Sequence, residues 1–139
     1  MPVKVIGITG TNNKSKTNEM KTAITEKKFK TIKTKGNLNN HIGLPLNIFD
    51  LSKTDEIAVI EMGMSAAGEI KRLAEIAKPG IGVVTNISEG HLVHLKTLKK
   101  VQAAKGELFD SLSEQETAIV NADDPLVLEL AKSARAKVV

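Results

Sequence analysis

The residues best suited to chemistry form one short loop near the N-terminus. Residues 10–15 read Gly-Thr-Asn-Asn-Lys-Ser and follow a short apolar, β-branched run at residues 3–9. A helix-like run to residue 28 comes next, with a set of residues at helical spacing: Met20, Ala23, Ile24 and Lys27. This is the order of elements around a phosphate-binding loop: first a strand, then a loop of small residues, then Lys-Ser, and then a helix. Such a loop binds polyphosphate through backbone N–H groups and the lysine, and its hydroxyl can bind Mg²⁺.

The loop departs from the standard phosphate-binding pattern at one position. Asn13 stands where glycine normally precedes the lysine, and the first glycine of the pattern would fall at Ile8. We interpret Lys14 as a ligand of the β- and γ-phosphates, although a surface lysine is the simpler explanation in a chain with 20 lysines and arginines. Ser15 could bind Mg²⁺, cap the helix, or do both.

Three further side chains could take part in chemistry. Glu61 ends an apolar run, where an unpaired carboxylate is costly, so a cation, a loop N–H or a lysine must stabilise it. His91 shares a loop with His94 and could bind a metal, although a lone histidine is more often a hydrogen-bonded structural residue. Lys105 lies at the edge of the apolar stripe of a predicted helix. Snorkelling is the usual explanation for such a lysine, and a chemical role is the alternative.

Strands and helices that alternate along the chain would position these residues. Short apolar runs predict strands at residues 3–9, 57–60, 81–85 and 117–120, with shorter ones at 29–34 and 137–139. Helices are predicted at residues 14–28, 43–51, 68–77, 97–112 and 125–134. Asp124 could cap the last helix, because Pro125 suits its first turn. The alternation predicts an α/β fold with three layers: a mostly parallel sheet of at least five strands, with helices on both faces.

The polar segments that follow the strands should converge in space, because ligands of open parallel sheets bind beyond the carboxyl ends of the strands. These segments are the loop at 10–15, Glu61, and residues 86–91 and 121–124. We therefore expect Lys14, Glu61, His91 and Lys105 to lie on the same side of the domain, beyond the strand ends. We also expect Glu61 and His91 to form a weak divalent-cation site.

Length and composition exclude several classes of protein. A chain of 139 residues suits one domain, and the absence of cysteine excludes disulfides and thiolate metal sites. No run of about 18 apolar residues or signal peptide is present, so we expect a soluble, cytoplasmic protein with no membrane partner. Three Phe and no Tyr or Trp argue against a single-stranded nucleic-acid platform, which needs stacking side chains. The net charge of +4 fits anionic ligands or a lysine-rich surface, and the sequence does not predict an oligomeric state.

Several motifs, taken together and in order, resemble those of the Mur ligases. They lie at residues 10–15, 36–46, 58–65, 85–92, 104–107 and 121–125, and so span nearly the whole chain. The segment Gly-Asn-Leu-Asn-Asn-His-Ile-Gly-Leu-Pro-Leu is similar to that of members that join D-alanyl-D-alanine to a UDP-N-acetylmuramoyl-tripeptide. The resemblance implies the central ATP-binding domain of such a ligase, with a phosphate-binding loop. It matches only most of that domain, so we expect the N-terminal and C-terminal ligase domains to be absent from residues 1–139.

The resemblance also implies roles for single residues. Lys105 matches a lysine that is carbamylated in many Mur ligases, which turns a cation into a metal-binding anion. Lys14, Lys105 and His91 are then the expected catalytic residues. ATP phosphates would be bound by the loop: Gly10, Thr11, Asn12, Asn13, Lys14 and Ser15. Mg²⁺ would be bound by Ser15, Glu61 and His91, and the nucleotide-sugar peptide would be contacted by Asn37, Asn39 and Asn40.

In such ligases ATP phosphorylates the terminal carboxylate of the substrate, and an amine then attacks the acyl phosphate. This sequence departs from the family at Asn13, which replaces glycine, while Ser15 replaces threonine, Ser88 replaces glycine and Lys16 adds a cation. Asparagine tolerates a positive φ, but its side chain could block the phosphates. We therefore expect the isolated chain to bind ATP weakly and to ligate nothing. The alternatives are a non-catalytic scaffold or engineered fragment that has lost nucleotide binding, and a stand-alone ATPase or kinase.

Overall fold

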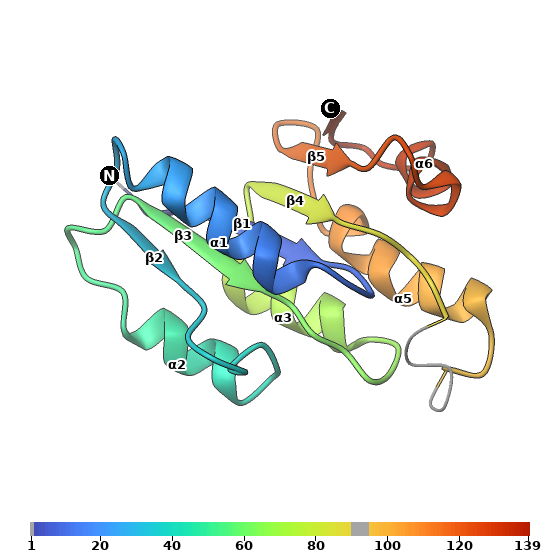
Figure 1. The fold of residues 1–139 in the computed structure, drawn as a ribbon, viewed down its shortest axis with the longest axis horizontal. Coiled ribbons are helices and arrows are strands. Elements are labelled where there is room, and N and C mark those ends of the chain that lie inside the picture. The colour runs from blue at the N-terminus through green and yellow to red at the C-terminus, as the bar shows by residue number, and fades with distance from the viewer. Residues whose placement is uncertain (1, 90–94) are drawn as a thin grey trace.

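The fold is built around one parallel sheet, as Figure 1 shows. The computed structural model describes residues 2–89 and 95–139. Within them the sheet has the strand order β2-β3-β1-β4-β5-β6, and every pair of neighbours is parallel. The strands are β1 (Lys4–Thr9), β2 (Thr31–Lys33), β3 (Ile57–Glu61), β4 (Ile81–Val84), β5 (Thr117–Val120) and β6 (Lys137–Val138). The prediction of a mostly parallel sheet with at least five strands is confirmed.

Helices cover both faces of the sheet, but unequally. They are α1 (Lys14–Thr25), α2 (Gly43–Phe49), α3 (Glu69–Ala77), α5 (Leu98–Asp110) and α6 (Pro125–Ala131). α1 lies on one face, in front of the sheet in Figure 1, and the other four pack on the opposite face. None of the helices in the described residues is both long and apolar enough to cross a membrane.

The buried face of α1 is polar, unlike that of an ordinary core helix. Met20 and Ile24 are 66% and 69% exposed, whereas Asn18 and Thr22 are buried. The helical spacing that the sequence shows from Met20 onward therefore belongs to the outer face. The physical reason is that β3 ends beneath α1 in the carboxylate of Glu61, which needs hydrogen-bond donors from the helix above it.

α5 supplies much of the core on the opposite face. Its predicted inner stripe is confirmed, because Val101 and Leu108 are fully buried. The helix packs very close to β1 and β4: a Cβ added at Gly7 would lie 3.3 Å from a Leu108 methyl, and one added at Gly82 would lie 3.2 Å from Leu108 Cγ. Glycine at these two strand positions therefore lets α5 pack close to the sheet. The distance between the helix and the sheet is set by this contact.

α6 begins where the sequence predicts, and Asp124 fixes that beginning. Its Oδ1 accepts hydrogen bonds from the backbone N–H groups of Leu126 at 2.9 Å and Val127 at 3.3 Å. Its Oδ2 accepts another from the N–H of Ile87 at 2.8 Å, and Pro125 occupies the first turn. One carboxylate therefore caps a helix and anchors the loop that follows β4.

We expect Asp124→Ala to lower the free energy of unfolding by about 1–2 kcal/mol, because the substitution removes an N-cap. Urea unfolding followed by circular dichroism measures the change. Asp123→Ala is the matched control, since Asp123 is the exposed neighbour, and it should change stability by less than about 0.5 kcal/mol. Equal stability of the Asp124 variant and the parent would show that the cap contributes nothing.

Candidate functional site

The loop at residues 10–15 is braced by the segment that follows β4. The N–H of Thr11 donates to the carbonyl of Asn86 at 3.0 Å, and the N–H of Asn12 donates to Oδ1 of the same Asn86 at 2.8 Å. The hydroxyl of Thr85 donates to the carbonyl of Asn12 at 2.6 Å, and the amide of Asn121 reaches the carbonyl of Thr85. The strand-end segments that were predicted to converge therefore do so, as far as the described residues go.

Two residues of the loop have backbone conformations that restrict their type. Gly10 has φ 152°, and a Cβ there would lie 1.8 Å from Thr85 Oγ1, so no other residue fits. Asn13 has φ 64° and ψ 11°, in the left-handed region. This is the conformation that makes glycine common at the position, and asparagine tolerates it better than most residues. The backbone of the loop is thus compatible with Asn13.

Lys14 begins α1 and points back into the loop. Its Nζ donates to the carbonyl of Gly10 at 2.9 Å. Burial lowers the pKa of Lys14 from its ordinary value, and the nearby carboxylate of Glu61 partly opposes this by raising it. An ammonium group has three N–H donors, so this bond leaves Nζ able to donate to a polyphosphate as well.

Glu61 is the buried acceptor at the centre of the site, with 5% of its surface exposed. Oε1 accepts from the side-chain amide of Asn18 at 3.0 Å, and Oε2 accepts from the hydroxyl of Ser15 at 3.4 Å. Its own N–H donates to Thr34 Oγ1 at 2.7 Å. The sequence left open which group stabilises this carboxylate, and the described partners are an amide and a hydroxyl. The N-cap position belongs to Asn13, so capping is not the role of Ser15 here.

Lys105 lies inside the protein, with only 1% of its surface exposed. Snorkelling to solvent is therefore wrong as its explanation. Burial and, to a smaller extent, the positive charge of Lys14 together lower the pKa of Lys105 to about 8. The amine is thus close to Lys14 and has an unusually large neutral fraction near neutral pH. A neutral amine is a nucleophile, whereas a protonated one is not.

His91 lies outside the described residues, so its predicted pairing with Glu61 as a cation site stays a prediction. Among residues 2–89 and 95–139 no group of three or more acidic or histidine side chains could hold a metal ion. The charged site that the structure does describe consists of Lys14, Glu61 and Lys105.

A cavity of about 370 Å³ opens beside Lys14. Asn39 and Asn40 line it together with the residues that follow β3, among them Gly63 and Ser65. Asn40 also holds the segment that leads into α2, because its Oδ1 accepts hydrogen bonds from the N–H groups of Ile42 and Gly43. Asn37, the third predicted substrate residue, is exposed and does not line this cavity.

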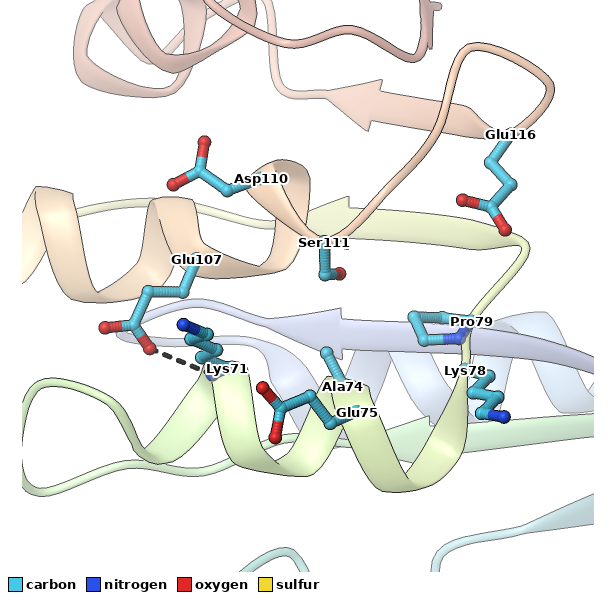
Figure 2. A pocket seen from close by; sticks show the side chains of 9 residues that line it. All are labelled: Lys71, Ala74, Glu75, Lys78, Pro79, Glu107, Asp110, Ser111 and Glu116. Carbon is cyan, nitrogen blue, oxygen red and sulfur yellow. Dashed lines mark hydrogen bonds between the residues drawn. The ribbon is translucent and has the colours of Figure 1, made fainter.

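A larger cavity, of about 680 Å³, lies away from this site (Figure 2). α3 and α5 form its walls, and Pro79 and Glu116 lie where the chain enters β4 and β5. It therefore opens near the amino ends of the strands, whereas Lys14 and Glu61 lie at the carboxyl ends. Cavity size alone would have pointed to the wrong end of the sheet.

Sequence reasoning missed two residues that support the site. Asn18 and Thr34 are buried and bond Glu61 from α1 and from the end of β2. Asn18 had a detectable signal, because it lies four residues after Lys14 and so shares its face of the helix. Thr34 had none, since the strand pairing that places it beside Glu61 is not visible in sequence.

The chain is similar to known proteins over almost its whole length. The family described as the Mur ligase middle domain matches residues 8–139. The UDP-N-acetylmuramoyl-tripeptide–D-alanyl-D-alanine ligase of Bacillus subtilis is 44% identical over 124 residues, which are 89% of this chain and 27% of that protein.

Solved structures give the same result. MurF from Acinetobacter baumannii has a TM-score of 0.93 and 32% identity, covering 98% of this chain and 30% of that one. MurF ligase from Thermotoga maritima, solved in complex with ADP, has a TM-score of 0.90 and 32% identity, covering 100% of this chain and 32% of that one. The chain thus spans less than a third of the length of these three relatives.

Lys105 should give the protein a stability that rises with pH. Its pKa is about 8 in the folded state against an ordinary 10.5, so between these values the unfolded chain binds more protons. Folding stability should therefore rise as pH increases from 8 to 10.5, by up to about 3 kcal/mol, and should not depend on this group below pH 8.

Lys105→Met removes the buried amine and should be more stable than the parent at pH 7, with the advantage shrinking toward pH 10. Urea unfolding at a series of pH values measures this, and Lys100→Met, at an exposed lysine of the same helix, is the control. Parallel stability profiles for the parent and Lys105→Met would contradict the argument.

Proposed function

The chain belongs to the Mur ligase family, and from this premise we propose that it is the ATP-binding part of a ligase that joins D-alanyl-D-alanine to a UDP-N-acetylmuramoyl-tripeptide. The observation that carries the proposal is the grouping of Lys14, Glu61 and a buried Lys105 around a braced small-residue loop. The names of the similar proteins support it, since the Bacillus subtilis relative is such a ligase and the Thermotoga maritima relative was solved with ADP.

In this proposal the loop at residues 10–15 binds the phosphates of ATP. Its backbone N–H groups and the first turn of α1 offer donors to the anion. Lys14 donates to the β- and γ-phosphates with the N–H groups that its bond to the Gly10 carbonyl does not use. That bond holds the amine against the loop in which the phosphates would lie.

Mg²⁺ would be held by Glu61 and Ser15, with His91 as the further ligand. The carboxylate and the hydroxyl fit a hard cation, because they are oxygen donors 3.4 Å apart that face each other at the start of α1. Bound there, Mg²⁺ would screen the negative charge of the phosphates. Asn18 keeps the carboxylate of Glu61 oriented through its bond to Oε1.

The cavity beside Lys14 would hold the end of the nucleotide-sugar peptide. Asn39 and Asn40 line it, and Asn37 lies in the same polar segment.

The reaction would take place in two steps. The peptide carboxylate attacks the γ-phosphorus of ATP, giving an acyl phosphate and ADP. The amine of D-alanyl-D-alanine then attacks the acyl carbon, and phosphate leaves as the amide forms. The protein contributes chiefly by holding the reacting groups close together.

A scaffold that has lost nucleotide binding is the second candidate. The side chain of Asn13 favours it, because it stands in the loop where phosphates would bind. ATP binding decides between the two functions, while phosphate release without any peptide substrate would indicate a stand-alone ATPase instead.

We expect weak ATP binding by the 139-residue chain and no ligation. Asn13→Gly should tighten ATP binding by about ten- to a hundredfold, since it removes both backbone strain and a side chain beside the phosphates. Isothermal calorimetry with ATP and Mg²⁺ measures this, and it suits a chain that lacks Tyr and Trp for fluorescence. Lys14→Ala is the negative control. Absence of binding in both the parent and Asn13→Gly would favour the scaffold.

Lys105 should form a carbamate with dissolved CO₂. Its neutral amine attacks the carbon of CO₂, an N–C bond forms and a proton is released, which leaves a carboxylate on the side chain. In ¹³C-bicarbonate at pH 8, NMR should show a carbamate signal in the parent that is lost in Lys105→Arg. Lys100→Arg is the matched control and should keep the signal. An unchanged spectrum in Lys105→Arg would place the modification elsewhere.

A further inference from the structure

Glu107 joins two helices that are far apart in the sequence. It lies on α5, and both of its carboxylate oxygens accept hydrogen bonds from the backbone of the start of α3. Oε1 accepts from the N–H of Gly68 at 2.7 Å, and Oε2 accepts from the N–H of Lys71 at 2.9 Å. Figure 2 shows the bond from Lys71 reaching across the gap between the helices.

This carboxylate does for α3 what a local cap does for most helices. Gly68 is the N-cap residue and has no side chain, so it cannot bond the free N–H groups of the first turn. Its φ of 87° favours glycine there, although a Cβ would meet no atom within 4 Å. Conformation thus disfavours a local capping side chain, and Glu107 provides the acceptor from 36 to 39 residues away.

The segment that Glu107 anchors is also a wall of the cavity beside Lys14. Gly63 and Ser65 line that cavity, and the N–H of Gly63 donates to the carbonyl of Asn39 at 2.8 Å. A Cβ at Gly63 would lie 2.9 Å from Asn39 Oδ1, so the contact is close. Glu69, in the first turn of α3, lines the same cavity and accepts hydrogen bonds from the N–H groups of Ser65 and Ala66, so it connects the start of α3 to this wall.

α5 carries Glu107 and Lys105 on different sides. Two residues along a helix are about 200° apart, so Lys105 is buried near Lys14 while Glu107 faces α3. One rigid helix thus connects the charged site to the wall of the neighbouring cavity.

We propose that Glu107 is a positioning residue that fixes the cavity wall, residues 63–71, relative to Lys105 and Lys14. The identity of the cavity's ligand, a UDP-N-acetylmuramoyl-tripeptide, rests on the proposed function. The link between the two helices does not depend on that function. Glu107 acts through the backbone that it anchors.

Hydrogen exchange followed by NMR tests the link in the 139-residue chain. In Glu107→Gln one carbonyl oxygen can still accept, and in Glu107→Ala neither bond remains, so the effects should be graded. We expect the amide of Lys71 to exchange about tenfold faster in Glu107→Ala. We also expect faster exchange at Gly63 and Ser65, beyond the helix start. Asp110→Asn, one turn further along α5 in the same large cavity, should change none of these amides.

Faster exchange confined to Gly68 and Lys71 would overturn the proposal, because Glu107 would then be only a helix cap. The glutamine variant keeps the test valid if Glu107→Ala does not fold.

Titration with UDP-N-acetylmuramoyl-tripeptide extends the test to the ligand. When binding is followed through the NMR shift of Ser65, we expect Glu107→Gln to have about tenfold lower affinity for the peptide than the parent. Its affinity for ATP should stay within about twofold of that of the parent. Equal peptide affinity in the parent and Glu107→Gln would overturn the positioning role. If the parent itself binds no peptide, the cavity of this chain does not hold the peptide by itself, and the exchange rates at Gly63 and Ser65 decide whether Glu107 positions the wall.

Discussion

A buried carboxylate at the end of β3 governs the architecture around the site. Glu61 has almost no contact with water, so the groups around it must supply hydrogen-bond donors. Asn18 and Ser15 provide them from α1, and the face that α1 turns toward the sheet is therefore polar. The apolar residues of the helix, such as Met20, are left outside. The orientation of α1, and with it the direction of Lys14, follows from the requirement of this one side chain.

Charge balance sets what the site can accept. Lys14 lies near both the carboxylate of Glu61 and the amine of Lys105, so within this group of three, two cations face one anion when both lysines are protonated. The excess positive charge disfavours the protonated form of Lys105 and favours any anion that enters. A bound polyphosphate would balance the excess positive charge, and so would a carboxylate attached to Lys105. The same group of charged side chains therefore suits both anions.

Much of this could be predicted from the sequence, and the exceptions have physical causes. Strands β1, β3, β4 and β5 and the cap at Asp124 were predictable because short apolar runs and capping patterns are local signals. The burial of Lys105 was indicated by periodicity but not decided by it. The outward turn of Met20 could not be foreseen, because it depends on a carboxylate more than 40 residues away. The bonds of Glu107 were hidden for the same reason, since they join residues that only the fold brings together.

The brace on the phosphate-binding loop also has a consequence for the order of folding during synthesis. The loop is synthesised before the segments that brace it, because Thr11 and Asn12 bond residues 74 to 77 positions later in the chain. β1 likewise pairs only with β3 and β4, which are made long after it. Gly10 therefore has no defined neighbours until β4 has emerged and docked. Contacts of such long range slow folding, so the nascent chain carries its loop unassembled until the segment that follows β4 has been made.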